Sequence, residues 1–136
     1  MPFLQGALLC DSAADYGGKV SILGGFVSII YVQMFPTPAP IQFAGRVAFS
    51  DEEARQPHTI VIRAKNAEDE VIAEIRGETP PGDPSTLAAP ELMGGLNIVV
   101  PMPFPIMHPG LFQVELLVDD QLFVSLPVKV TDQIPG

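Results

Sequence analysis

The chain has 136 residues, of which 47% are hydrophobic and only 17% are charged, and its formal net charge is −9. This length fits one domain, and the composition excludes both a disordered chain and a coiled coil. The excess of acidic over basic residues repels phosphate backbones, so we do not expect nucleic acid as a partner. We therefore expect one folded domain over residues 1–136.

The N-terminal segment is read as a first strand over residues 3–13. The start "MPFLQGALLCD" has a short apolar stretch and no basic residue, which argues against a lipoprotein signal. Alternation places Cys10 on one face with Leu4 and Leu8, so we expect it to be a small core residue. A single cysteine cannot form an internal disulfide, and the chain has no long apolar span. These features predict a cytoplasmic protein that does not enter a membrane.

The second predicted strand, "KVSILGGFVSIIYV" at 19–32, contains a glycine pair at 24–25 that favours a bend or a bulge. Past this bend both faces are apolar, with Phe26, Ile30 and Val32 expected on one face and Val27, Ile29 and Tyr31 on the other. Such a strand needs cover on both faces, from its own loops or from another subunit.

Further strand patterns follow in order. Residues 41–49 alternate as a half-exposed strand, residues 58–78 as a hairpin about a turn at 66–69, and residues 91–101 as a sixth strand. The two strands of the 58–78 hairpin share a charged outer face, which carries Arg63, Lys65, Glu74 and Arg76. These residues suit cross-strand ion pairs.

The last hairpin, at 111–130, turns at Asp119 and Asp120. Its inward residues are expected to be Phe112, Val114, Leu116, Val118, Leu122, Val124, Leu126, Val128 and Val130. Eight strands at this spacing predict an all-β fold: a single two-layer antiparallel β-sandwich of about eight strands, Ig-like or C2-like, with proline-rich loops.

Three proline-dense links join these strands, at 33–40, 78–91 and 101–110. Proline stiffens such links and excludes helix. The middle link is long enough for a helical turn near 85–89. The third is expected to pack Phe104 and Ile106 onto the core rather than to serve as a polyproline ligand.

The sequence shows no catalytic or cofactor-binding motif. Neither His58 nor His108 has a partner at metal-ligand spacing, and there is no Gly-X-Ser-X-Gly elbow or phosphate-binding loop. Acidic clusters at 51–53, 68–70 and 119–120 fall where turns are already expected. We therefore expect no enzyme activity, catalytic residue, metal or cofactor. The alternative is a small-ligand or Ca²⁺-binding C2-like sandwich that uses the acidic turns.

With "GGKVSILGGF" at 17–26 and "HPGLFQVELLVDDQLFVSLPVKV" at 108–130, the chain resembles a family of small bacterial, mainly actinobacterial, proteins of unknown function. The resemblance implies a β-sandwich of bacterial cytosolic origin and brings no catalytic residue. Phe112 stands where many related sandwiches have a tyrosine, so no tyrosine-corner hydroxyl bond is implied.

The residues favour a non-enzymatic interaction or structural module whose partner is a second copy or another protein. The expected interface combines the apolar strand with neighbouring loops and consists of Val27, Ile29, Tyr31, Met34, Phe35, Phe104 and Met107. If these side chains cluster on the surface, they exceed the apolar patch that a monomer normally exposes.

Overall fold

The computed structural model of the protein describes residues 2–16, 19–79, 94–102 and 104–133. Within these residues the protein is all-β, as predicted, with one helical turn, α1 (Asp51–Ala54). The strands are β1 (Phe3–Tyr16), β2 (Lys19–Gly25), β3 (Ile29–Tyr31), β4 (Thr37–Pro38), β5 (Gln42–Phe49), β6 (Thr59–Lys65), β7 (Val71–Glu78), β8 (Gly94–Pro101), β9 (Pro105–Ile106), β10 (Gly110–Val118) and β11 (Gln121–Thr131).

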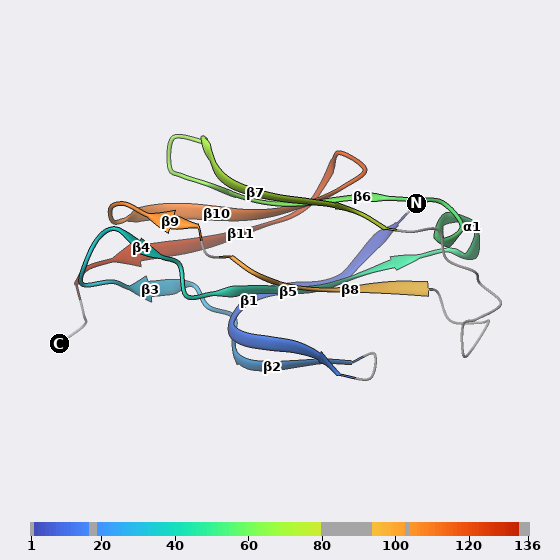
Figure 1. Cartoon of the computed structure of the whole chain (residues 1–136), viewed down its shortest axis with the longest axis horizontal. Helices are drawn as coiled ribbons and strands as arrows, with labels where there is room; N and C mark the ends of the chain where they lie inside the picture. The colour runs from blue at the N-terminus through green and yellow to red at the C-terminus, as the bar shows by residue number, and fades with distance from the viewer. Residues whose placement is uncertain (1, 17–18, 80–93, 103, 134–136) are drawn as a thin grey trace.

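These strands form three sheets (Figure 1). The four-stranded sheet has the order β2-β1-β5-β8, the five-stranded sheet has the order β3-β11-β10-β6-β7, and β4 pairs with β9 alone. Alternate apolar residues of both larger sheets enter one core, among them Phe43 and Val47 of β5 and Val114 and Leu116 of β10. The described residues thus hold more strands than the eight expected, because the proline-dense links contribute short strands of their own.

Two predicted turns are confirmed. In the β6–β7 turn, the Asn66 side chain accepts hydrogen bonds from the backbone N–H groups of Glu68 and Glu70. In the β10–β11 turn, Asp119 and Asp120 have φ angles of 51° and 65°. Positive φ at both central residues is the geometry that suits the twist of a two-residue hairpin.

The second predicted strand is in fact two strands in different sheets. Gly24 and Phe26 adopt φ angles of 64° and 61°, so the chain reverses its twist there and passes from β2 to β3. Phe26 leaves the ladder at this point and is 80% exposed, whereas Ile30 and Val32 are buried. The shared face predicted for the three residues is therefore wrong. β3 also pairs with β11 in parallel, so the sheet is mixed rather than purely antiparallel.

The predicted faces of β1 need a correction as well. The pairing of β1 with β5 shifts between Leu4 and Gly6, and this bulge offsets the alternation by one residue. Leu9 and Leu4 therefore face the core. Cys10 is fully buried, as expected, but it lies on the opposite face from them rather than on a shared face with Leu4.

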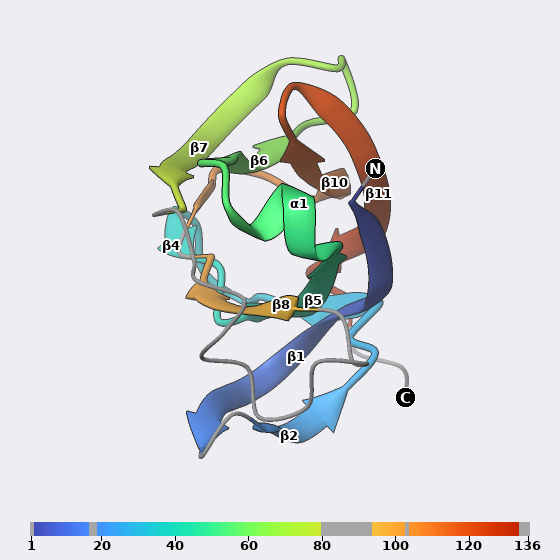
Figure 2. The same ribbon diagram turned by 90° about the vertical axis from the view of Figure 1, so that its right-hand side faces the viewer.

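β1 continues past its pairing with β5 and forms a projecting hairpin with β2. It pairs with β5 from Phe3 to Cys10 and with β2 from Cys10 to Tyr16. We call residues 11–16 and 19–25 the β1–β2 arm. Figures 1 and 2 show this arm standing out from the four-stranded sheet, on the side away from the core.

The outer face of the five-stranded sheet carries ion pairs, although not between the predicted strands. Arg63 lies opposite Glu74 on β7, yet its Nε donates to Oε1 of Glu115 on β10, at 2.7 Å. Lys65 Nζ lies 3.4 Å from the same oxygen. Together the two cations leave Glu115 only 7% exposed, so this pair is more buried than a solvated face would be.

Two further expectations concern Leu122 and the segment that contains the middle proline-dense link. Leu122, predicted inward, is 54% exposed, because the register of β10 and β11 shifts between Leu116 and Leu117, next to the turn. The 80–91 part of the middle proline link, with its helical turn near 85–89, and the first three residues of the sixth strand lie outside the described residues.

Candidate interaction surface

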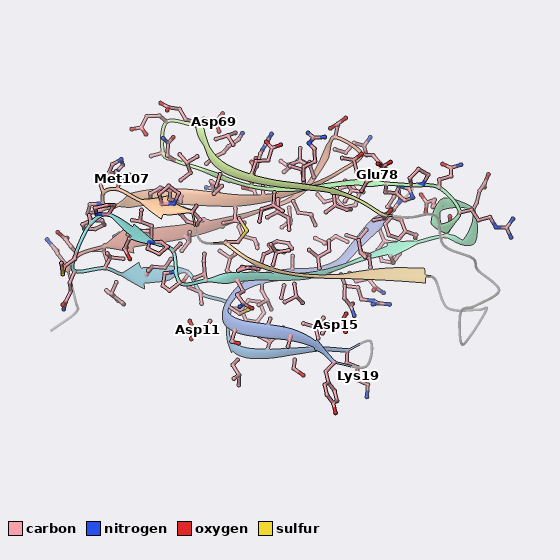
Figure 3. The ribbon with its side chains drawn as sticks, in the orientation of Figure 1. Asp11, Asp15, Lys19, Asp69, Glu78 and Met107 are labelled. Carbon is pink, nitrogen blue, oxygen red and sulfur yellow. The ribbon has the colours of Figure 1, made fainter. Side chains whose placement is uncertain are left out.

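Exposed apolar side chains gather at the end of the molecule where β3, β4 and β9 lie (Figure 1). Figure 3 shows Met107 at this end. Four of the seven residues predicted for the interface are exposed here, and Leu111 at the start of β10 joins them. We call the set the end surface, and its exposed fractions are 45% for Ile29, 47% for Tyr31, 81% for Met34, 60% for Met107 and 48% for Leu111.

β3 is held at this end by its parallel pairing with β11. Lys129 N donates to Ser28 O and Val32 N donates to Thr131 O, each at 2.9 Å. Ile30 and Val32 anchor the segment in the core. Because side chains alternate along a strand, the residues on either side of Ile30 point to solvent.

The proline-dense links complete the end surface. Thr37 of β4 pairs with Ile106 of β9, and Ala39 N donates to Phe104 O at 3.0 Å. This ladder brings the link after β3 beside the link that precedes Met107. It also buries Ile106 completely, as the sequence predicted.

Three predicted interface residues lie elsewhere. Phe104 is only 2% exposed and packs in the core, so its place in an exposed interface is wrong and its predicted packing on the core is confirmed. Val27 and Phe35 are half-buried and pack against the core.

Leu111 was missed by the sequence reading, which placed the interface only in β3 and two links. Its register reveals it: Leu111 pairs with Lys129, and Lys129 pairs with Ile29. Directly paired residues point to the same face of a sheet. The three side chains therefore form one row across the outer face of the five-stranded sheet.

A second site, centred on His58, was also missed. The His58 ring is buried and stacks on Phe49 with ring centroids 4.5 Å apart. Its Nδ1 lies 2.7 Å from Oδ2 of Asp119, and its Nε2 lies 2.7 Å from the backbone oxygen of Glu53. The other carboxylate oxygen of Asp119 accepts the Thr59 N–H at 3.0 Å. Both ring nitrogens thus face acceptors, which suits the imidazolium ion.

The pKa values of this pair shift in opposite directions. Burial opposes protonation of His58, but the hydrogen bonds to Asp119 and to the Glu53 carbonyl outweigh it and raise the pKa of His58. Burial also acts to raise the pKa of Asp119, but the hydrogen bonds from His58 and the Thr59 N–H lower it. Both shifts favour the charged form of the pair.

Two of the three acidic turns come near each other, because His58 contacts both Asp119 of the 119–120 turn and the backbone oxygen of Glu53 in the 51–53 turn, but the 68–70 turn lies apart. His58 and Asp119 sit near α1, while Asp69 lies one strand length away at the β6–β7 turn (Figure 3). The Glu53 carboxylate accepts the Ser50 N–H in a capping box. Among the described residues, no three His, Cys, Asp or Glu side chains gather as metal ligands do. Calcium binding therefore has no observation in its favour.

The fold and the end surface together define a class: a small all-β protein with an exposed apolar end and a buried histidine paired with a partly exposed aspartate. The chain belongs to the family of unknown function DUF6941, whose model matches residues 5–131. This confirms the resemblance to a family of unknown function and extends over nearly the whole chain. A search of curated proteins found no match. No helix in the described part of the chain has the length and hydropathy needed to cross a membrane.

Proposed function

We propose that the protein is a non-catalytic interaction module that self-associates through the end surface. The proposal treats residues 1–136 as one Ig-like or C2-like sandwich domain of a bacterial cytoplasm. A single core shared by the two larger sheets supports the one-domain reading. The buried, unpaired Cys10 fits a reducing compartment.

The observation that carries the proposal is the amount of apolar surface at one end. At roughly 200 Å² for a large side chain, the exposed fractions of the five residues correspond to about 550 Å² per copy. A standard interface takes about 800 Å² from each partner. The end surface therefore supplies much of the area for a modest dimer.

The edge of β3 supports the same surface. β3 is the last strand of its sheet, and the groups that bond to β11 are Ser28 O and Val32 N. Backbone groups alternate in direction along a strand, so those of Ile29 and Tyr31 point toward the open edge. Such an edge is a template for pairing with another strand. A second copy, related by a two-fold axis, offers the same edge and the same apolar side chains of the end surface.

The His58–Asp119 pair supports the non-catalytic part of the proposal. A general base needs an accessible lone pair near its substrate. Here the ring is 8% exposed and both of its nitrogens are committed within the fold. The pair therefore fastens the β10–β11 turn to the segment after α1, as a structural element does.

Sedimentation velocity over a concentration series tests the proposal. We expect a monomer–dimer equilibrium with a dissociation constant roughly in the micromolar range, as suits a small interface. Tyr31→Lys and Met34→Lys place charges in the end surface and are expected to leave a monomer at every concentration.

Leu122→Lys is the matched control, because Leu122 is 54% exposed on β11, at the end of that strand away from its pairing with β3. It is expected to dimerise as the wild type does. Retention of the dimer in Tyr31→Lys, or loss of it in Leu122→Lys, contradicts the proposed surface.

A further inference from the structure

A pocket lies away from the end surface, between the β1–β2 arm and the outer face of the four-stranded sheet. Figure 2 shows β1 and β2 curving away from β5 and β8 at this place. The pocket has a volume of about 460 Å³ and draws its lining from β1, β2, β5 and β8 together with Phe26. This volume is within the range of small-molecule sites, about 300–1,000 Å³. We call it the arm pocket.

The pocket exists because the residues of its floor have small side chains or none. Gly6, Ala44 and Gly45 lie there, while Leu8, Ile22 and Phe26 provide apolar walls. Gly45 has a packing reason, since a Cβ atom there would lie 3.0 Å from the Phe43 ring. Gly6 has no such packing reason, because a Cβ atom there would meet nothing within 4 Å. The space above Gly6 is therefore open room rather than a close backbone contact.

The wall of the pocket carries positive charge without a carboxylate partner of its own. Arg46, half-buried, donates from Nε to Gln5 Oε1 at 2.7 Å and from Nη1 to Asn97 Oδ1 at 2.6 Å. Both acceptors are neutral amides, and neither bond uses Nη2. Lys19 also lines the pocket and is exposed. In a chain with 16 acidic and 7 basic residues, two adjacent cations without an ion pair among the described residues are unusual.

One carboxylate lies close to this group and limits the charge that the pocket can accept. Asp15 Oδ2 is 3.5 Å from Asn97 Nδ2, and Figure 3 shows Asp15 and Lys19 toward the tip of the arm. The local charge is therefore about one net positive unit, which favours a monoanion over a dianion such as a phosphate monoester.

We propose that the arm pocket binds a small monocarboxylate with an apolar body, such as a medium-chain carboxylate. The apolar body packs against Leu8, Ile22 and Phe26, and it covers part of the Phe26 ring, which is 80% exposed. The carboxylate meets the free end of the Arg46 guanidinium, whose planar fork matches a carboxylate. This function is separate from self-association, because the arm pocket and the end surface share no residue.

Isothermal titration calorimetry with octanoate tests the proposal, with 1-octanol as a neutral probe of the same chain length. Wild type is expected to bind octanoate at least tenfold more tightly than 1-octanol. Arg46→Gln is expected to lose this tenfold preference and to keep its affinity for 1-octanol.

Gly6→Val fills the open floor and is expected to lower the affinity for both probes at least tenfold. Gly77→Val is its matched control, since Gly77 lies on β7, outside the arm pocket, and a Cβ atom there also meets nothing within 4 Å. It is expected to bind within twofold of wild type. A ¹H–¹⁵N correlation spectrum of each variant shows that the fold is kept.

Three results overturn the proposal. The first is that octanoate gives wild type neither binding heat nor a change in its ¹H–¹⁵N spectrum, at concentrations up to tenfold above those at which 1-octanol binds. The second is wild-type affinity for octanoate in a folded Gly6→Val. The third is an equal loss of affinity for octanoate and 1-octanol in Arg46→Gln. Since Gly6→Val leaves the end surface intact, failure here is distinct from failure of self-association.

Discussion

The pair of buried His58 with Asp119 makes a prediction that depends on charge alone. Asp119→Asn keeps the turn, because asparagine tolerates the positive φ of 51° found there. The amide oxygen can still accept the Thr59 N–H. The amide nitrogen then faces Nδ1 of His58, so the ring is neutral and donates from Nε2 to the Glu53 carbonyl. The substitution exchanges a charged hydrogen bond for a neutral one with the same geometry.

The expected loss of stability is about 1 kcal/mol near pH 5.5. Hydrogen bonds to charged groups contribute about 1.5–3 kcal/mol, and neutral ones about 0.5–1.5 kcal/mol. The Asp119 side chain is 45% exposed, so solvent screens the pair and the lower end of the difference applies. For a domain of this size, this loss lowers Tm by roughly 3–5 °C.

The pH dependence of this loss identifies its cause. The pKa of His58 is raised, so its contribution is fully present below about pH 6.5, the unfolded pKa, and is lost as pH rises through the folded pKa. The pKa of Asp119 is lowered, so its contribution is present above about pH 3.9 and is lost as pH falls through the folded pKa. The Tm difference between wild type and variant is therefore expected to be largest between about pH 4 and pH 6.5.

Scanning calorimetry of both proteins from pH 4 to pH 9 measures this difference. Asp120→Asn is the control, since Asp120 occupies the same turn with a φ of 65° and is not a partner of His58. It is expected to show a small difference that does not rise toward acid pH. A difference for Asp119→Asn that stays constant from pH 5 to pH 9 refutes the charged pair.

Three other predictions follow from packing. Glu115→Ala is expected to lower the free energy of unfolding by about 1–2 kcal/mol in urea melts, because it leaves two half-buried cations without their shared carboxylate. Its control, Glu74→Ala, removes an exposed pair and is expected to lower the free energy of unfolding by less than about 0.5 kcal/mol. An equal loss of stability in the two variants contradicts this. Gly45→Ala is expected to cost about 1–3 kcal/mol through its approach to Phe43, and a neutral melt counts against it. Burial raises the pKa of Cys10, so its thiol is expected to react with Ellman's reagent only at the rate of unfolding; fast reaction of native protein disproves this.

Local signals in the sequence were sufficient for the strands and several turns. The Asp119–Asp120 pair indicated a hairpin turn because acidic residues tolerate positive φ, and the glycine pair at 24–25 indicated a bend. The sheet that the chain enters after this bend is not determined by the local sequence. The move of the chain from one sheet to the other depends on β11, about 100 residues further along, which receives β3.

Two other features also depend on contacts that no short segment contains. The bulge at Gly6 moves Leu9 into the core, and a glycine in a strand signals such a bulge only weakly. His58 and Asp119 are 61 residues apart, so their pairing follows from the register of β6 beside β10. For the candidate surface, apolar residues were correctly found in β3 and its links, yet whether Phe104 or Met107 faced solvent depended on the β4–β9 ladder.

Light scattering coupled to size-exclusion chromatography tests the central claim, self-association, most directly. Wild-type protein is loaded at concentrations from well below to well above the micromolar range. The account predicts a mass that rises with concentration from the monomer value of 14.6 kDa toward twice that value, and that stays at the monomer value in Tyr31→Lys. A wild-type mass that remains at the monomer value at every concentration contradicts it.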